Sequence, residues 1–371
     1  MRIGFDAKRA FFNRSGLGNY SRDTIRILSD YFPMNDYLLY TPKPNKSVYF
    51  HKASNLCISG PETAKDKFFS SHWRSYGLSK QLKRDGVQLF HGLSNEIPKG
   101  IEKYAIPSVV TIHDIIFMRF PHFYSYVDRI IYENKFKFSS LHANKVIAVS
   151  EQTKNDLVEF FKIPENKIEV VYQGCNPIYW ERVTDSKKEE TLMKYLIPEQ
   201  FILYVGTVEE RKNILNVVKA IHKEKIDFPL VIVGKSTPYF AKVKAYVELH
   251  EMKNIHFLQN VPTDDLPALY QLSKLFVYPS LFEGFGIPIL EALTSKTPVI
   301  TSRGGCFSEA GGKSTIYLNP ESVDELAEAI KAVINSSRMR DNMIVDGFIH
   351  AQQFKQDRIA RNLMDVYEKL I

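Results

Sequence analysis

Cysteines and long hydrophobic runs are both scarce in this sequence. Three cysteines, Cys57, Cys175 and Cys306, are spread over 371 residues. An odd number without metal-ligand spacing argues against a disulfide framework or a zinc site and is typical of a reducing cytoplasm. No apolar run approaches the roughly 20 residues that a membrane-spanning helix needs, and the N-terminus lacks the apolar core of a signal peptide. We therefore expect a cytoplasmic protein, with any membrane contact peripheral, on the inner face of the plasma membrane.

Several catalytic and binding signatures are also missing. The sequence has no P-loop lysine motif, no Gly-x-Ser-x-Gly turn and no Asp-x-Asp pair placed to hold a divalent metal. It has no helix-turn-helix, zinc-finger or RNA-binding aromatic signature. The formal charge of +7 therefore favours phosphorylated ligands or an anionic membrane over nucleic acid. We expect neither a bound metal nor a nucleic-acid partner.

Short apolar strands alternate with helical stretches along the chain, which is typical of a parallel α/β architecture. A chain of 371 residues is too long for one core and indicates two domains. We expect the linker within 174–198, whose middle is polar, and a last helix over about 356–370. Ligands of such domains bind at the carboxyl ends of the strands, in the cleft between domains. The predicted strands are Ile3–Ala7, Tyr37–Thr41, Gln88–His91, Ser108–His113, Val146–Val149, Ile168–Val171, Phe201–Val205, Leu230–Val233, Ile255–Leu258, Leu275–Tyr278, Val299–Thr301 and Thr315–Leu318.

The segment PSLFEGFGIPILEA, residues 279–292, is the most informative in the chain. A buried strand ends in a turn that holds Glu283 and Gly286, and Pro288 then opens a helix. Such a helix N-terminus suits a phosphate, because its N–H groups and the helix dipole point at the ligand. Glu291 stands about one turn into the helix, so both carboxylates can reach one ligand. The alternative is a plain strand–turn–helix with surface acids.

Three further places carry candidate ligand contacts. Gly16 and Gly18 precede a helix expected from about residue 21 and would let the backbone approach a phosphate, with an ordinary flexible turn as the alternative. His113 ends a strand, where it either contacts a reacting group or caps the next segment by a hydrogen bond. Arg211 and Lys212 follow another strand and suit a diphosphate, unless they are solvated surface.

Together these segments resemble the retaining glycosyltransferases of family 4, and the resemblance covers nearly the whole chain. The family has the GT-B fold, an α/β fold of two Rossmann-like domains whose parallel sheets face a cleft. The resemblance implies an acceptor-side domain at 1–178, a donor-binding domain at 179–355, and a C-terminal helix at 356–371 that crosses back to the first domain. The matching segments are SGLGNYSR (15–22), LFHGLSNEIP (89–98), TIHDIIF (111–117), VIAVSEQTKNDL (146–157), VVYQGCNP (170–177), YVGTVEERKN (204–213), PSLFEGFGIPILEA (279–292) and TPVITSRGG (297–305).

The resemblance implies roles in holding the donor. Glu283 and the backbone of Gly284, Phe285 and Gly286 would bind the hydroxyls of the donor sugar. Glu291 would accept hydrogen bonds from the ribose.

It also implies how the charged part of the donor is bound. Arg211 and Lys212 would neutralise the diphosphate, which Gly16 and Gly18 would approach from the other domain. His113 would stand beside the anomeric carbon, so that His113, Glu283 and Lys212 form the catalytic set.

The nucleotide base would lie near Gly234 and Val261. One residue departs from the family's pattern, because many members have arginine where this chain has Thr207. The diphosphate site is then one charge short unless Arg211 compensates.

The resemblance is nearest to bacterial mannosyltransferases of surface-polysaccharide assembly, including that of lipopolysaccharide. It implies retaining, metal-independent transfer of a hexose, most simply mannose from GDP-mannose, to a glycan or lipid-linked acceptor. No cofactor beyond the nucleotide-sugar donor is expected. The alternatives are a UDP-sugar-dependent hexosyltransferase of the same fold and a sugar-nucleotide epimerase, which would bind the donor alone.

A basic and aromatic segment at 65–84, KDKFFSSHWRSYGLSKQLKR, is the candidate membrane contact. Lysines and arginines interleaved with aromatic residues suit a helix that lies on an anionic membrane surface. The alternative is core packing, because Phe69, Trp73 and Tyr76 fall at helical spacing.

Overall fold

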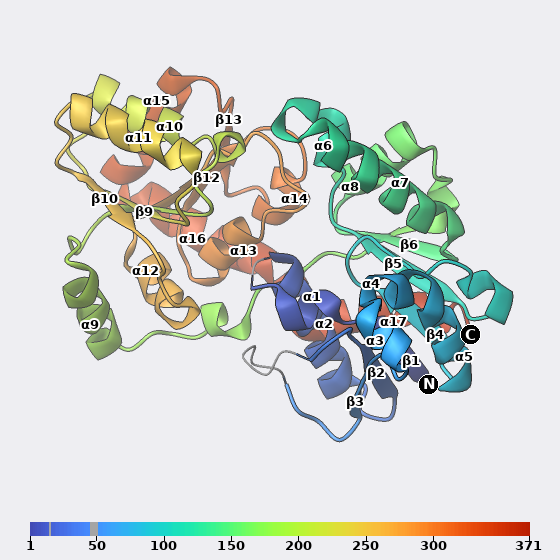
Figure 1. Ribbon diagram of the computed structural model, residues 1–371. Coiled ribbons are helices and arrows are strands. Elements are labelled where there is room, and N and C mark those ends of the chain that lie inside the picture. Colours follow the sequence, from blue (N-terminus) through green and yellow to red (C-terminus); the bar gives the residue numbers. More distant parts are fainter. Residues whose placement is uncertain (15, 45–50) are drawn as a thin grey trace. The chain divides into compact units, whose positions relative to one another are not determined.

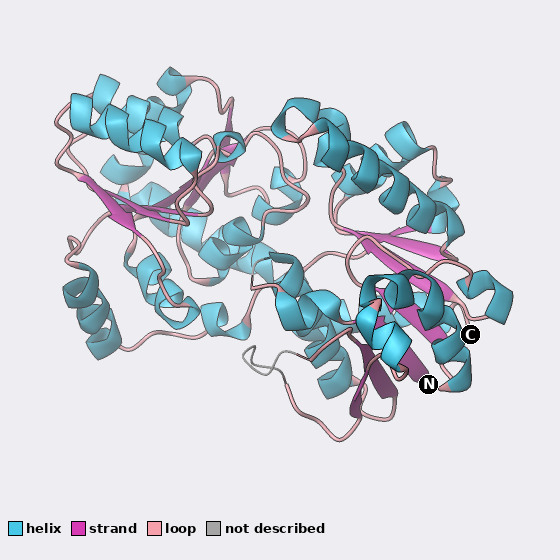
Figure 2. Ribbon diagram, viewed as in Figure 1, coloured by secondary structure: helices cyan, strands magenta, loops and turns pink. Residues whose placement is uncertain are grey.

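The computed structural model describes residues 1–14, 16–44 and 51–371, and the chain divides into two units (Figure 1). Unit 1 comprises Met1–Gln173 and Lys355–Ile371, and unit 2 comprises Gly174–Phe354. Ser15, the first residue of the segment SGLGNYSR, lies outside the described residues. Each unit contains a sheet flanked by helices (Figure 2), and all strand pairings are parallel. The predicted α/β class with two parallel sheets is confirmed.

The sheet of unit 1 has seven strands in the order β3-β2-β1-β4-β5-β6-β7. Its central strands β4 and β5 are buried along their whole length, as expected for parallel strands covered on both faces. The prediction missed β3, an edge strand whose residues Cys57 and Ile58 are exposed and give no buried-strand signal. The strands are β1 (Arg2–Asp6), β2 (Asp36–Tyr40), β3 (Leu56–Ser59), β4 (Leu89–Gly92), β5 (Ser108–Ile112), β6 (Lys145–Ala148) and β7 (Ile168–Val170).

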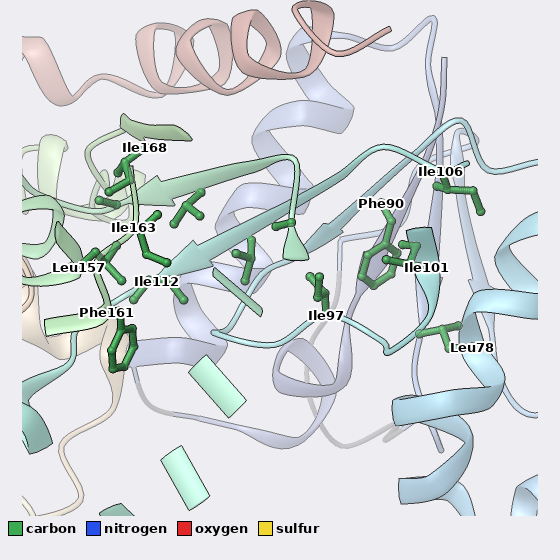
Figure 3. Packing of buried hydrophobic residues seen from close by; sticks show 14 of the residues in the cluster. Leu78, Phe90, Ile97, Ile101, Ile106, Ile112, Leu157, Phe161, Ile163 and Ile168 are labelled. Carbon is green, nitrogen blue, oxygen red and sulfur yellow. The ribbon is translucent and has the colours of Figure 1, made fainter. Parts of the chain in front are cut away.

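The helices of unit 1 enclose one large apolar core (Figure 3). Leu78 from α5 and Leu157 and Phe161 from α8 meet strand residues such as Phe90 and Ile112. The helices are α1 (Lys8–Phe12), α2 (Gly16–Tyr31), α3 (Ala64–Phe68), α4 (Ser70–His72), α5 (Leu78–Arg84), α6 (Ile116–Arg119), α7 (Tyr126–His142), α8 (Glu151–Phe161) and α17 (Gln356–Glu368).

The last helix, α17, belongs to unit 1 and packs against α2. Its helical spacing buries Ile359, Leu363 and Tyr367. The Tyr367 hydroxyl lies 2.6 Å from Nδ1 of His91, and Nε2 of the same imidazole lies 2.8 Å from the Thr111 hydroxyl. These contacts join the C-terminal helix to β4 and β5, in the middle of the sheet.

The segment 65–84 is not the single helix that the prediction assumed. It consists of α3, α4, one π-helical turn at Trp73–Gly77, and α5. The Trp73 side chain is buried, and its Nε1 donates to Oε1 of Gln81 at 2.9 Å. Phe69 and Tyr76 are exposed, so the irregular backbone turns only the tryptophan of the three toward the core.

The sheet of unit 2 has six strands in the order β10-β9-β8-β11-β12-β13. The order reverses between β8 and β11, which are neighbours in space, so unit 2 has its topological switch point there. The strands are β8 (Ile202–Val205), β9 (Leu230–Val233), β10 (Ile255–Leu258), β11 (Leu275–Tyr278), β12 (Val299–Ser302) and β13 (Ile316–Leu318).

The predicted linker at 174–198 contains a helix, because its polar middle forms α9 (Asp185–Tyr195). Thr184 caps this helix, and Asp265 anchors it by accepting from Nζ of Lys194 at 2.6 Å and from the Tyr195 hydroxyl at 2.7 Å. The other helices of unit 2 are α10 (Ile214–Lys223), α11 (Pro238–Leu249), α12 (Leu266–Leu272), α13 (Ile287–Thr294), α14 (Phe307–Gly311), α15 (Val323–Asn335) and α16 (Ser337–Ala351). Throughout the described ranges, no helix is both long and apolar enough to cross a bilayer.

Candidate functional site

The candidate donor site of unit 2 lies at the carboxyl ends of β8 and β11. The loop after β8 carries Arg211 and Lys212, and the loop after β11 carries Glu283. Since the two strands are neighbours, these loops meet, and the Leu281 N–H donates to the Arg211 carbonyl at 2.8 Å. The switch point thus brings together two segments that are about seventy residues apart in the sequence. This is where open parallel sheets bind ligands.

The Glu283 carboxylate is the centre of this site. Its Oε1 accepts hydrogen bonds from Nζ of Lys212, from the Tyr278 hydroxyl at 3.0 Å and from the Ser280 hydroxyl. Nη1 of Arg211 lies 3.0 Å from the same oxygen. Four side chains from two loops and the end of one strand therefore hold one carboxylate oxygen in place.

The electrostatics of this cluster follow from its burial and its two cations. Burial alone would raise the pKa of Glu283, but Arg211 and Lys212 outweigh it and lower the pKa to about 2. Burial lowers the pKa of Lys212 in spite of the neighbouring carboxylate. Glu283 is therefore ionised at neutral pH, and the cluster places two basic side chains beside one acid.

The turn before α13 explains the glycine at position 286. Gly286 caps the helix with φ +109°, a conformation that residues with a side chain rarely adopt. Pro288 lies in the first turn of the helix, where its missing N–H costs little. Phe285 is buried and packs on Phe354 with ring centroids 5.5 Å apart, so its side chain supports the turn from the core. The Phe285 side chain therefore points away from solvent, and the turn at 284–286 presents its backbone.

Glu291, the second acid of the motif, is the fifth residue of α13. Its Oε2 accepts from the Tyr270 hydroxyl at 2.9 Å, and the Tyr179 hydroxyl is also hydrogen-bonded to this carboxylate. The Glu291 carboxylate raises the pKa of both tyrosines, after the larger effect of their burial. Both phenols therefore remain hydrogen-bond donors to Glu291.

The residues expected near the nucleotide base lie at the ends of β9 and β10. A Cβ on Gly234 would come within 2.1 Å of the Gly206 carbonyl oxygen, so only glycine allows the two strand ends to approach this closely. The Gly206 N–H donates to the Val233 carbonyl at 2.9 Å. Val261 is half-buried in the loop after β10.

In unit 1, the prediction of a loop around Gly16 and Gly18 was wrong. Both glycines lie in the first turn of α2, which begins at Gly16 rather than near residue 21. A Cβ on Gly18 would lie 1.8 Å from the Asn13 carbonyl oxygen, whereas Gly16 has open space around it. Close packing of the preceding segment on the helix therefore explains Gly18.

His113 directly follows β5, as predicted, and is buried. Its Nε2–H donates to the Leu93 carbonyl at 2.9 Å, and its ring meets Tyr20 edge-on at 4.5 Å. Burial lowers the pKa of His113 to about 4, so the imidazole is neutral at neutral pH. The side chain that bonds the start of α6 is that of Asp114, whose Oδ1 accepts from the Ile116 N–H at 3.2 Å.

Four tyrosine and serine side chains of the site were missed from the sequence. Tyr278 and Ser280 lie within five residues of Glu283, so hydroxyl groups flanking the motif were an available signal. Tyr179 and Tyr270 are far from Glu291 along the chain, and only the fold brings them together. In the described part of the chain, no group of three or more His, Cys, Asp or Glu side chains could hold a metal ion.

Comparison with known proteins identifies the family. The model of the family "Glycosyltransferase Family 4" matches residues 31–178, and that of "Glycosyl transferases group 1" matches residues 187–348. O-antigen chain mannosyltransferase B of Escherichia coli is 29% identical over the full length of both chains. O-antigen chain mannosyltransferase RfbU of Salmonella typhimurium is 30% identical over 60% of each chain.

The fold is shared with solved structures, among them a glycosyltransferase from Rickettsia africae, with a TM-score of 0.75 over 100% of this chain and 98% of that chain, at 18% identity. Anabaena HepE in complex with UDP-glucose superposes with a TM-score of 0.77 over 100% of both chains, at 15% identity. Of the two family-model matches, the first ends near the boundary between the units, and the second lies within unit 2. The protein is a glycosyltransferase of the family 4 type, with the GT-B fold.

Proposed function

We propose that this enzyme transfers a hexose, mannose from GDP-mannose, to a glycan or lipid-linked acceptor of surface polysaccharide biosynthesis, with retention of configuration. The observation that carries the proposal is the cluster of Glu283, Arg211 and Lys212 at the switch point of unit 2. A carboxylate suits sugar hydroxyls, and two adjacent cations suit a diphosphate. Mannose is favoured because the relatives named above are mannosyltransferases.

The geometry supports a division of roles in the reaction. Cleavage of the sugar–phosphate bond develops positive charge at the anomeric carbon and negative charge on the departing diphosphate. Arg211 and Lys212 would stabilise the departing diphosphate, and fixed cations of this kind contribute most of the catalysis in such sites. The acceptor oxygen would bond to the anomeric carbon on the face from which the diphosphate leaves, and the leaving phosphate oxygen would take the acceptor's proton, so the configuration is retained.

In this proposal, Arg211 takes the place of the arginine that many family members have where this chain has Thr207. Arg211 reaches the same carboxylate as Lys212 and is also paired with Glu209 at 2.8 Å. Two cations are therefore available for the diphosphate without a metal ion, which supports metal-independent transfer.

A product analysis tests this function. We expect purified enzyme, incubated with GDP-mannose, a soluble glycan acceptor and EDTA, to form a glycosidic bond with the anomeric configuration of the donor, read by anomeric proton NMR. An inverted linkage would contradict the mechanism, and loss of activity with EDTA would contradict metal independence. Turnover of a UDP-sugar instead of GDP-mannose would change only the donor, an outcome consistent with the UDP-glucose bound in Anabaena HepE.

A second prediction concerns the tyrosines behind Glu291. If Glu291 binds the ribose, Tyr270→Phe should weaken nucleoside diphosphate binding about three- to tenfold, because the half-buried carboxylate loses one of its two phenol donors. The Glu291→Ala variant should weaken it further, while kcat changes less than Kd. Isothermal titration calorimetry measures the affinity. Tyr246→Phe is the matched control, since its hydroxyl bonds His222 in the same unit, and an effect as large as that of Tyr270→Phe would contradict the role.

A further inference from the structure

The solvent-facing side of α7 carries apolar side chains where polar ones are expected. Tyr126, Ile130 and Leu141 are exposed and recur at the spacing of one helix face, with Val127 and Ile131 beside them. Tyr126 is 72% exposed and Val127 65%. The opposite face of α7 packs against the core and contributes an aromatic cluster to it. The outer apolar residues therefore have no partner within the described part of unit 1 that hides them from water.

A second exposed apolar group lies on the segment 64–77. Phe68 is 82% exposed, and Phe69 and Tyr76 are also exposed. This segment and α7 lie side by side, because Lys99 contacts both: its Nζ is 3.2 Å from the Tyr76 hydroxyl and 5.4 Å from the centre of the Phe138 ring.

An ionic contact joins the same two segments. Glu96 pairs with Arg74 of the π-helical turn at 3.0 Å and with Lys135 of α7 at 3.5 Å. The segment 64–77 follows β3 and α7 follows β5, so both begin at the carboxyl edge of the parallel sheet.

The exposed charges around these apolar groups are mainly positive. Lysines at positions 65, 67, 135 and 137 are exposed, and Lys137 lies on the same face of α7 as Tyr126 and Ile130, about two to three turns further along the helix. Two nearby acids are hydrogen-bonded to the N-cap residues of α3 and α7: Asp66 accepts from the Thr63 hydroxyl at 2.8 Å, and Asp128 accepts from the Ser125 hydroxyl at 2.7 Å. Glu133 is half-buried. The surface thus presents apolar side chains and lysines together.

We propose that this surface docks on an anionic lipid bilayer. We call it the apolar–lysine face and define it by Phe68, Phe69, Tyr76, Tyr126, Val127, Ile130, Ile131 and Leu141 with Lys65, Lys67, Lys135 and Lys137. Apolar side chains enter the interface between headgroups and acyl chains, while lysines extend to the phosphates. The inference rests on the proposed function in one respect, that a lipid-linked acceptor gives the docking a purpose.

Vesicle co-sedimentation tests the docking without measuring transfer. The wild-type chain should pellet with vesicles of phosphatidylcholine and phosphatidylglycerol at low ionic strength, and not with phosphatidylcholine alone. Tyr126→Ser/Val127→Ser should lower the partition coefficient at least about tenfold, because two apolar side chains no longer enter the interface. Lys65→Gln/Lys67→Gln should weaken binding and reduce its salt dependence. The matched control is Leu249→Ser/Val345→Ser, two exposed apolar residues of unit 2, which should bind like wild type.

Two measurements keep the outcomes separate. Equal melting temperatures show that the variants are folded, and equal transfer to a soluble acceptor shows that the donor site is intact. The proposal is overturned if wild type stays in solution with anionic vesicles, or if Tyr126→Ser/Val127→Ser pellets as wild type does. It is also overturned if light scattering shows a dimer that this variant dissociates, since the face would then be a contact between copies. A wild type that binds vesicles but transfers no sugar contradicts only the proposed function.

Discussion

Replacing Glu283 by glutamine should lower kcat/KM at least about a hundredfold, the scale of losing one preorganised transition-state contact. The carboxylate is held by Lys212, Arg211, Tyr278 and Ser280, so its position is fixed before the donor arrives. Glutamine keeps the shape but loses the charge that strengthens a hydrogen bond to a sugar hydroxyl. Steady-state kinetics with the donor measure the loss.

Glu283→Gln should have different effects on the binding of the donor's sugar and on the binding of its diphosphate. Glu283 pairs with both Arg211 and Lys212, so a neutral side chain in its place leaves these cations more available to an anion. Binding of a nucleoside diphosphate, which has no sugar, should therefore be no weaker than in wild type. Glu210→Gln, an exposed acid in the same loop as the cations, is the control. If Glu283→Gln kept full kcat/KM, the carboxylate would have only a structural role.

The twelve predicted strands agree with the structure to within one residue at both ends, and β3 was missed. Parallel strands covered on both faces are continuous apolar runs, and Leu230–Val233 and Leu275–Tyr278 agree with the structure at both ends. Where polar or mixed segments are held by tertiary contacts, the sequence was insufficient. Asp185–Tyr195 was predicted as part of a linker because its sequence is polar. Its helix is held by Asp265, a residue distant in the sequence, so the segment itself carries no sign of the contact. The segment 65–84 has helical spacing, but its π-helical turn changes the direction of the side chains.

The candidate donor site was predictable in its charged residues and not in its neutral ones. Glu283, Glu291 and the glycine turn form a local pattern whose chemistry can be interpreted without a fold. The meeting of Lys212 with Glu283 depends on the strand order, which places β8 beside β11. Tyr179 and Tyr270 are aromatic residues like many core residues, and only their hydroxyl contacts to Glu291 distinguish them.

Replacing Lys212 by methionine should also lower kcat/KM at least about a hundredfold, but with a different signature from Glu283→Gln. Methionine fills a similar volume and removes the charge, so Glu283 keeps only Arg211 as a cationic partner. Because Lys212 would stabilise the departing diphosphate, the affinity for a nucleoside diphosphate should fall together with kcat. The exposed lysine of the following helix gives a matched control, Lys223→Met, which breaks an ion pair with Asp324 away from the site.

The double variant Glu283→Gln/Lys212→Met decides whether the two residues act as one unit. Independent residues would multiply their effects to about ten-thousandfold, whereas residues in direct contact are not additive. Since Nζ of Lys212 donates directly to Glu283, we expect the double variant to lose little more kcat/KM than either single one. Fully multiplied effects would show that the ion pair between Lys212 and Glu283 is not kept during transfer. Unchanged kinetics in Lys212→Met would instead place the diphosphate elsewhere, and would leave Arg211 as the cation beside Glu283 that has to be tested next.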